Sequence, residues 1–575
     1  MNDTGYESQA EIILRQITAV PSYHRLCQVL PDAESIDPAS LKMILESAAR
    51  FSEEVLYPVN RSGDVQGCRI EEGRVKTPDG YKEVWGAFVS QGWNAVDQPA
   101  KYGGQGLPSF VNVACREMFD RACMAMGMVS GPQRAASLVL LQYAQPELCE
   151  EWVTHFIDGS WSASIGISEP DAGSDVGRVR TRAVPLPTGG WQIDGEKMWT
   201  SFGDNDMVER IGCLLLARTP DAPAGSAGLS LFLVPNTVLD ETGAWVNNGV
   251  FVRRIEEKLG LHGSPTCVMG FERAQGYLIG SLNRGLSQLF VMIQNMRILV
   301  AIEGVGIAHG ASKVAYDYAF ERKQGGNPNF PPVAIATHPE IQRLLLNMHS
   351  KVEVLRALVL ELALRMDNLH YQSDDVEKQE SDNLVQWLLP IIKASCAEAA
   401  FDVSSDAIQV LGGAGYTREW PVEQWLRDSR MMSIAEGATG IQALDLLHRR
   451  LWRSKRVGLD AFLQVAVSEI TAGTRLVNDD ALYVIDRLKV AADWLDTRQE
   501  TPVEAEAGAT AFLRLATLAA TGWMAVRLAN LSGDSIADRL SAAGRYWLSD
   551  ITARADREFA EIQLGAARLE LFNSL

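Results

Sequence analysis

Hydrophobic residues recur at helical spacing in two long parts of the chain. In the first 159 residues, the apolar positions of 12–17, 41–55 and 109–126 each fall on one face of a 3.6-residue repeat, which predicts amphipathic helices. From residue 279 onward the repeats are longer. Four of them predict a four-helix bundle, at 285–319, 338–366, 384–411 and 436–452. Four more predict an additional helical domain, at 461–472, 481–497, 507–532 and 536–565.

The segment from 160 to 278 has a different pattern. Short β-prone runs alternate with turn residues there, at 162–167, 180–184, 190–193, 211–216, 229–234, 250–255 and 268–271. Several short strands at close spacing predict a small sandwich or barrel. We therefore expect an α+β chain of four parts: an N-terminal α-helical domain (1–159), a middle β-domain (160–278), a four-helix bundle (279–455) and an extra α-helical domain (456–575).

Composition narrows the range of functions. The formal net charge of −19 argues against nucleic acid or an anionic membrane as the main partner. The eight cysteines are scattered without a Cys-x-x-Cys pair, which favours buried thiols in a reducing compartment and no metal site. No secretory signal is visible. The apolar run 509–531 contains Arg514 and Arg527, so we expect a buried helix and no membrane span. Together these features predict a cytoplasmic protein.

One carboxylate has neighbours that favour chemistry. Glu436 lies between the apolar Ile434 and Ala435 on one side and Gly437 on the other, just before the periodic segment 443–451. Partial desolvation raises the pKa of a carboxyl group, and a raised pKa is what a general base needs near neutral pH. A single glutamate of this kind is also a common solvated loop residue, so its interpretation depends on the rest of the chain.

Five ordered segments supply that context. They are a glycine-rich turn at 98–108, Ser168-Glu169-Pro170 with Ala172-Gly173-Ser174-Asp175, Asp194-Gly195-Glu196-Lys197 with Trp199-Thr200-Ser201, the stretch 257–266, and 407–416 followed by Pro421-Val422-Glu423 and Arg427-Asp428. In this order they resemble the motifs of the acyl-CoA dehydrogenase family. The added C-terminal helices resemble a longer subgroup of that family, which hosts several substrates, so the resemblance does not name the acyl chain.

The resemblance implies that FAD is the cofactor. A flavin is a large flat ring with polar edges, and it needs a wall of backbone and hydroxyl groups. The residues that the family pattern places at this wall are Ile167, Ser168, Ser174, Trp199, Thr200 and Ser201. Trp199 would pack against the ring and the Ser201 hydroxyl would bond its N5 atom. Without the resemblance, Trp199 is equally well explained as a core aromatic and Ser201 as a strand-end hydroxyl.

The resemblance also implies a partner subunit. Arg322 suits the FAD pyrophosphate by bidentate pairing, and Gly412 and Gly413 let backbone approach a phosphate closely. The family pattern adds Gln409 to this group and takes these contacts from a neighbouring subunit. We therefore expect a homodimer or a dimer of dimers. Taken alone, Arg322 and the glycines are equally a solvated helix-end arginine and a helix C-terminal turn.

The reaction implied is α,β-dehydrogenation of an acyl-CoA thioester to the trans-2-enoyl-CoA. Glu436 would take the α-proton while the β-hydride goes to flavin N5, and electrons would then pass to an electron-transfer flavoprotein. Hydrogen bonds from the Glu436 N–H and a flavin hydroxyl would stabilise the developing enolate. Ser174, Arg297 and Gly437 are the implied substrate contacts. Without the resemblance, Arg297 reads as a helix salt-bridge partner.

Some positions depart from the family pattern. Ala435 replaces a tyrosine beside the base, and Ala438 replaces a threonine, so Thr439 becomes the candidate cofactor contact. Gly325 replaces a phenylalanine that packs on flavin. Two alternatives remain open: a nitroalkane-oxidase-like relative, against which Glu436 argues, and a DNA-protecting flavoprotein, against which the acidic C-terminal domain argues.

Overall fold

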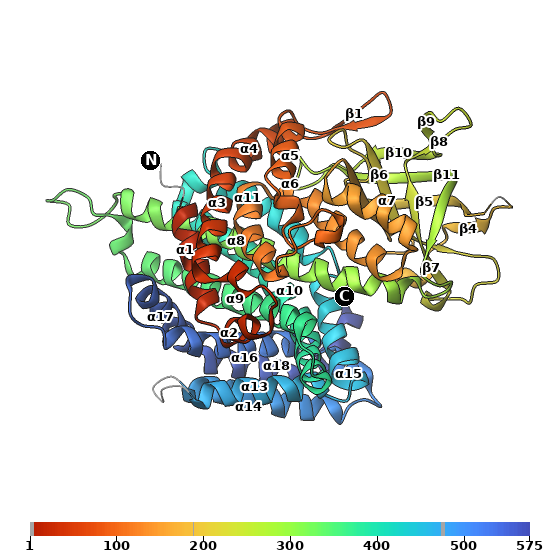
Figure 1. Cartoon of the computed structure of the whole chain (residues 1–575). Helices are drawn as coiled ribbons and strands as arrows, with labels where there is room; N and C mark the ends of the chain where they lie inside the picture. Colours follow the sequence, from red (N-terminus) through yellow and green to blue (C-terminus); the bar gives the residue numbers. More distant parts are fainter. Residues whose placement is uncertain (1–4, 188, 473–477) are drawn as a thin grey trace. The chain divides into compact units, whose positions relative to one another are not determined.

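The computed structural model describes residues 5–187, 189–472 and 478–575. Figure 1 shows the helices and strands of the chain. The chain forms two compact units. Unit 1 comprises Met1–Ala49, Val113–Arg121 and Arg297–Leu575, and unit 2 comprises Arg50–Asn112 and Ala122–Met296. The division into four domains expected from the sequence stays a prediction.

Unit 2 is built around strands that close into a ring. Hydrogen bonds connect β11 to β5, β5 to β4, β4 to β6, β6 to β7, and β7 back to β11. The strands that form this ring are β4 (Arg182–Pro185), β5 (Trp191–Ser201), β6 (Arg210–Arg218), β7 (Leu229–Pro235) and β11 (Thr266–Ile279). The predicted small barrel is therefore present.

Two further strands extend the ring. β10 (Val250–Ile255) pairs antiparallel with β11, and β3 (Trp161–Gly166) pairs parallel with β6. Cys213, Leu214, Leu215 and Leu216 are consecutive residues of β6 and are all buried, so both faces of this strand are covered. This explains why its sequence is a continuous apolar run without polar alternation.

The remaining elements of unit 2 surround this ring or lead into it. They are α4 (Tyr57–Gln66), the hairpin of β1 (Arg69–Glu71) and β2 (Arg74–Lys76), α5 (Tyr81–Ser90), α7 (Pro146–Ile157), and the two-stranded pair β8 (Thr237–Leu239) and β9 (Trp245–Asn247). In the glycine turn, a Cβ on Gly104 would lie 2.0 Å from the Gln98 carbonyl oxygen, so only glycine fits there.

Unit 1 contains the helical bundle and the N-terminal helices (Figure 1). The long helices are α8 (Gly285–Glu321, in unit 1 from Arg297), α9 (Pro339–Tyr371) and α10 (Asp375–Leu411). The fourth begins at Thr439, not Glu436, as α12 (Thr439–Leu444), and continues as the π-helical segment η10 (Asp445–Arg453). The N-terminal helices are α1 (Tyr6–Thr18), α2 (Pro21–Val29) and α3 (Pro38–Phe51), and α6 (Ser109–Tyr143) contributes Val113–Arg121.

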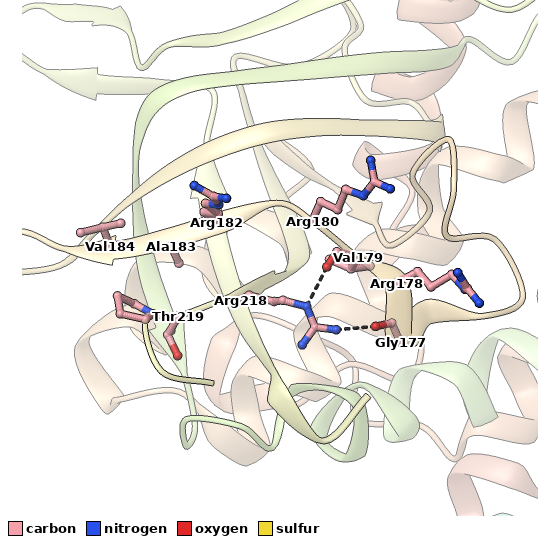
Figure 2. Close-up of a pocket in the computed structure, with 10 residues that line it drawn as sticks. Gly177, Arg178, Val179, Arg180, Arg182, Ala183, Val184, Arg218 and Thr219 are labelled. Atoms are coloured by element: carbon pink, nitrogen blue, oxygen red, sulfur yellow. Dashed lines mark hydrogen bonds between the residues drawn. The ribbon is translucent and has the colours of Figure 1, made fainter. Parts of the chain in front are cut away.

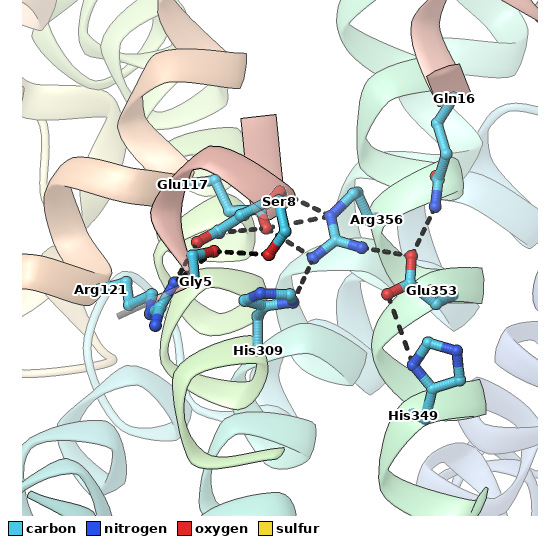
Figure 3. A network of polar contacts seen from close by, with 10 residues as sticks. Gly5, Ser8, Gln16, Glu117, Arg121, His309, His349, Glu353 and Arg356 are labelled. Atoms are coloured by element: carbon cyan, nitrogen blue, oxygen red, sulfur yellow. Dashed lines mark hydrogen bonds and ion pairs between the residues drawn. The ribbon is translucent and has the colours of Figure 1, made fainter. Parts of the chain in front are cut away.

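A buried polar network connects these helices within unit 1 (Figure 3). Arg356 of α9 donates to both carboxylate oxygens of Glu117 and also pairs with Glu353. Glu353 accepts a hydrogen bond of 2.7 Å from Gln16 of α1. Because these charges are buried, each needs its partners, and the network fixes how the three helices pack.

The additional C-terminal helices also belong to unit 1. They are α13 (Val457–Ala472), α14 (Asn478–Asp496), α15 (Pro502–Glu506), α16 (Ala509–Ala529), α17 (Ser535–Leu548) and α18 (Ile551–Gln563). The prediction of one helix over 536–565 is wrong, because the chain breaks at Ser549 and Asp550. Their short polar side chains favour non-helical backbone.

Three helices are long and apolar enough to cross a membrane by length and composition. They are α8, α10 with its extension to Tyr416, and α16. In these helices 72%, 78% and 83% of the most apolar stretch is buried inside the protein. For α16 this agrees with the predicted buried helix, which carries the fully buried Trp523.

Candidate active site

Glu436 lies in a short loop between two helical segments of unit 1. The loop follows η9 (Arg430–Ser433) and ends where α12 begins. Glu436 has a φ of 54°, and Gly437 has a φ of 94°. A left-handed conformation costs a non-glycine residue roughly 1–2 kcal/mol, so it persists only where surrounding contacts impose it.

Lys393 of α10 supplies the strongest of these contacts. Its ammonium group donates to the carbonyl oxygens of Met432 at 2.8 Å, Ala435 at 2.6 Å and Gly437 at 2.7 Å. All three N–H bonds of the ammonium group are thereby used, and Lys393 is fully buried. The two carbonyls on either side of Glu436 are therefore fixed to a helix of the bundle.

A second side chain holds the same loop from α12. The Gln442 amide donates to the carbonyl oxygens of Glu436 at 3.0 Å and Gly437 at 3.1 Å. A Cβ on Gly437 would lie 2.6 Å from this amide nitrogen, so the turn needs glycine. Together, Lys393 and Gln442 explain how the left-handed backbone of Glu436 is maintained.

The charges near Glu436 tune its protonation. Burial raises the pKa of the Glu436 carboxyl group, and the positive charges of Lys393 and Arg297 oppose that rise. Burial lowers the pKa of Lys393 to about 8, and the negative charge of Glu436 limits the fall. Arg297 is itself buried and paired with Asp445 at 2.7 Å, so its charge is held in place.

Two groups of Glu436 are available for a substrate. Among the described residues, neither its carboxylate nor its backbone N–H has a hydrogen-bond partner. A carboxylate with a raised pKa can remove a proton, and an N–H group beside it can stabilise charge that develops on a carbonyl oxygen. This pairing suits proton abstraction next to a carbonyl group.

Unit 2 contains the residues expected to hold the flavin ring. The segments 168–175 and 194–201 lie side by side, because the Met198 N–H donates to the Ser168 carbonyl at 2.9 Å. The buried Lys197 joins them as well, donating to the Ile167 carbonyl at 3.2 Å and to Glu169 at 2.7 Å. This ion pair fixes the loop after β3 against β5.

The end of β5 is shaped for a flat polar-edged ligand. Trp199 has a φ of 59° and is 56% exposed, so its indole is held outward and is not a core aromatic. The next residue, Thr200, is buried, and among the described residues its hydroxyl has no hydrogen-bond partner. Ser201 is half-buried and Ser174 is exposed. An exposed indole and an unsatisfied buried hydroxyl fit the flavin that the sequence predicts.

The residues expected to contact a pyrophosphate lie in unit 1. Arg322, Gln409, Gly412 and Gly413 are all exposed. The end of α8 approaches the chain that follows η8 (Gly412–Tyr416), because the rings of Tyr318 and Trp420 meet edge to face at 5.3 Å. This contact brings the end of α8 close to Trp420, which follows the glycine turn in the sequence.

Thr439 has a different contact. Its hydroxyl donates to Glu398 at 2.5 Å.

Among the residues that the structure describes, no three histidine, cysteine, aspartate or glutamate side chains are grouped as a metal site requires.

Three functional candidates were not found from the sequence. Lys393, Gln442 and Asp445 all act on the Glu436 region, yet none of them was predicted as a site residue. Lys393 had one available signal: it directly follows the apolar run Leu388–Ile392, in the buried middle part of α10. A lysine in such a position requires buried acceptors.

The fold and the site define the class of protein. Three family models match the chain in order: "Acyl-CoA dehydrogenase, N-terminal domain" over residues 38–160, "Acyl-CoA dehydrogenase, middle domain" over 164–274, and "Acyl-CoA dehydrogenase, C-terminal domain" over 283–451. The chain therefore belongs to the acyl-CoA dehydrogenase family, a family of FAD-dependent oxidoreductases. Its reaction is the α,β-dehydrogenation of an acyl-CoA thioester.

One curated relative and two solved structures are similar to most of this chain. The 3-methylmercaptopropionyl-CoA dehydrogenase of Ruegeria pomeroyi is 35% identical over 508 residues, which cover 86% of each chain. Caenorhabditis elegans ACDH-11 in complex with C11-CoA superposes with a TM-score of 0.75 at 21% identity, over 95% of this chain and 94% of that one. An acyl-CoA dehydrogenase of Bacillus anthracis complexed with FAD gives 0.75 at 19%, over 93% and 90%. These matches include the additional C-terminal helices.

Proposed function

We propose that Glu436 is the base of this dehydrogenase and that its preferred substrate is a short or substituted acyl-CoA. The observation that carries the first part is the geometry of Glu436: a carboxylate with a raised pKa and a free N–H group, on a loop held by Lys393. Support for the second part comes from Ala435, where the family pattern has tyrosine, and from the short sulfur-containing substrate named for the Ruegeria pomeroyi relative.

Several residues of the chain have separate roles in the proposed reaction. Glu436 removes the α-proton of the bound thioester, and its backbone N–H donates to the thioester oxygen as negative charge develops there. Arg297 keeps a positive charge near the base, and Asp445 holds Arg297 in position. Bound FAD supplies the hydride acceptor of the reaction. Trp199, Thr200 and Ser201 would hold its ring, with Ile167 and Ser168 beside them.

Two measurements test this proposal. Purified protein is mixed without oxygen with a panel of acyl-CoA thioesters of different length, branching and heteroatom content, and the visible flavin absorbance is followed. Short or substituted chains should bleach the flavin faster than long linear chains, and faster bleaching by long chains would overturn the substrate assignment. The Glu436→Gln variant should retain FAD yet fail to bleach, because an amide does not accept the proton. Bleaching at the wild-type rate would remove Glu436 as the base.

We also propose the electron acceptor, the oligomeric state and the compartment of this enzyme. The acceptor of its electrons is an electron-transfer flavoprotein, by analogy with the family. The protein is a homodimer or a dimer of dimers in the cytoplasm. Eight free cysteines favour a reducing compartment. Three aromatic side chains of unit 1, Tyr316, Phe320 and Tyr416, are exposed, which favours a contact with a second copy. Sedimentation velocity tests the assembly, and reduction of purified electron-transfer flavoprotein tests the acceptor.

A further inference from the structure

Three charged side chains form a buried cluster inside unit 1 that no step of the proposed reaction uses. Arg116 and Asp120 come from α6, and Glu303 comes from α8. The Arg116 guanidinium group lies 2.9 Å from an Asp120 carboxylate oxygen and donates to Glu303 at 3.1 Å. All three side chains are at most 4% exposed, so solvent does not balance their charges.

A glycine of α8 brings this cluster close to the helix that holds the base loop. A Cβ on Gly304 would lie 2.6 Å from the Cys396 carbonyl oxygen of α10, so only glycine lets the two backbones approach this closely. Lys393, one turn before Cys396, binds the loop of Glu436. Glu303, which directly precedes Gly304, is therefore within reach of the negative charge of Glu436.

The cluster has two carboxyl groups for one guanidinium group. Among the described residues, Arg116 is the only cation paired with Asp120 or Glu303. In the same part of the chain, no hydrogen-bond donor reaches either oxygen of Asp120 or the Oε2 atom of Glu303. A buried carboxylate without donors and without its own cation is strongly unfavourable. One of the two carboxyl groups therefore keeps its proton.

Glu303 is the group that keeps the proton. Arg116 lies nearer to Asp120 than to Glu303, and Glu303 also faces the charge of Glu436. Burial, together with the charge of Asp120, raises the pKa of Glu303 to about 8, and Arg116 opposes the rise. Burial raises the pKa of Asp120 only to about 6. At neutral pH, Asp120 is thus ionised beside Arg116 and Glu303 is neutral.

An arginine-rich cavity in unit 2 shows that a charge imbalance has a different outcome at the surface (Figure 2). Arg218 donates there to the neutral carbonyl oxygens of Val179 at 2.8 Å and Pro223 at 3.1 Å, so its charge is not cancelled. Arg182 is its register partner on β4, and Arg178 and Arg180, both exposed, complete the set. Solvent screens these cations, whereas only a proton can remove the excess charge of the buried cluster.

We infer that Glu303 is a positioning residue for the base: the cluster keeps a proton on Glu303, so that Glu436 is the carboxyl group that ionises and takes the α-proton. An ionised Glu303 would place a like charge near the base and oppose ionisation of Glu436. Lys393 of α10 and Arg297 of α8 act in the opposite sense. The inference rests on the proposed function, because it assumes that Glu436 is the base.

The experiment follows the acid limb of the pH profile of flavin reduction. Asp120→Asn removes the carboxylate that competes for Arg116, so Glu303 should ionise at neutral pH and the acid limb should move to higher pH. At a fixed pH on that limb, the rate should fall about tenfold, the effect of a shift of one pKa unit. The double variant Asp120→Asn/Glu303→Gln should return to the wild-type position, which a structural disturbance by Asp120→Asn would not do.

A single variant, a matched control and a spectrum complete the test. Glu303→Gln replaces the neutral acid by a neutral isostere, so its acid limb should stay near the wild-type pH. Asp402→Asn removes an exposed aspartate of α10, paired with Lys351 at 3.3 Å, and should not move the limb. The infrared difference between wild-type and Glu303→Gln holoenzyme, recorded at neutral pH without substrate, should contain the carbonyl band of a protonated carboxyl group.

Three results would overturn the inference. An acid limb that moves to lower pH in Glu303→Gln, or an infrared difference with carboxylate bands only, would mean that Glu303 is ionised in the wild-type enzyme. An unchanged limb in Asp120→Asn would remove the link between the cluster and the base. A shift that persists in the double variant would assign Asp120 a structural role. A wild-type enzyme that no thioester bleaches would contradict the proposed function instead, and the infrared difference would still report on Glu303.

Discussion

Replacing Lys393 with methionine should release the loop that carries Glu436 from helix α10. The substitution keeps the length of the side chain but removes the three N–H groups that bind the carbonyls of Met432, Ala435 and Gly437. Hydrogen bonds from a charged donor contribute roughly 1.5–3 kcal/mol each. Burial of the ammonium group, which lowers its pKa to about 8, offsets part of that gain.

The size of the effect follows from the backbone of Glu436. Its left-handed conformation costs roughly 1–2 kcal/mol, and the loop relaxes when the lysine is absent. We expect the reactive arrangement to become less populated by about 2 kcal/mol, which is ~30-fold in the rate constant of flavin reduction. The charge of Lys393 also opposes the raised pKa of Glu436. Its loss should therefore raise that pKa further and move the acid limb of the pH profile to higher pH.

A second variant separates charge from geometry. Lys393→Arg keeps the positive charge, so the acid limb should stay near its wild-type position. The planar guanidinium group cannot place three N–H bonds on the same three carbonyls, so the rate should still fall. Lys42→Met, which removes an exposed lysine paired with Glu46 at 3.7 Å, serves as the control and should change neither quantity.

The assay is anaerobic stopped-flow reduction of the bound flavin across a pH series, with FAD content and thermal unfolding measured on each variant. A lysine that only stabilised the fold would lower the melting temperature without shifting the acid limb. A Lys393→Met enzyme that reduced flavin at the wild-type rate, with an unshifted acid limb, would refute the reasoning.

Three other changes have defined outcomes. In the wild-type enzyme, the rate of flavin reduction should rise with pH as Glu436 deprotonates. It should fall above about pH 8, because Lys393, whose charge also senses Arg297 and Glu398, then loses one of its three donors. A rate that stays constant above pH 8 in Lys393→Arg would assign this fall to Lys393. Asp445→Asn should leave the charge of Arg297 uncompensated and lower the pKa of Glu436, which a pH profile shifted to more acidic values would reveal. Arg527→Met removes the buried ion pairs with Glu361 at 3.0 Å and Glu469 at 2.7 Å. The free energy of unfolding, measured in urea, should fall by about 3 kcal/mol. A fall below about 1 kcal/mol would contradict the burial of these pairs.

The fold was largely predictable because each element has a strong periodic signal. The run Ile211–Leu216 indicates a strand buried on both faces, and the structure extends it to β6. Boundaries were less predictable, since they depend on tertiary contacts. Glu436 was assigned to the start of a helix, but Lys393 and Gln442 hold it in a left-handed turn, which a local pattern cannot indicate.

The candidate site was predictable only where a motif is continuous in sequence. Ser168 and Trp199 belong to such motifs, and the Met198–Ser168 hydrogen bond brings the two segments together. Lys393 is far from Glu436 in the sequence, and Asp445 is far from Arg297. Only the packing of α8, α10 and η10 makes these residues neighbours. The strand pairing of Arg182 with Arg218 is hidden for the same reason.

The additional C-terminal helices limit how copies of this chain can associate. Helices α16 and α17 pack on α9, and α13 packs on α10, with Arg527 bonded to Glu361 of α9. A helix face that is covered by its own chain is not available to a second copy. The faces of α9 and α10 beneath these helices are therefore excluded from any subunit contact, and an interface must use other surfaces, such as the end of α8 with its exposed Tyr316 and Phe320. In this chain, the added helices cover surface of α9 and α10 that a second copy could otherwise contact.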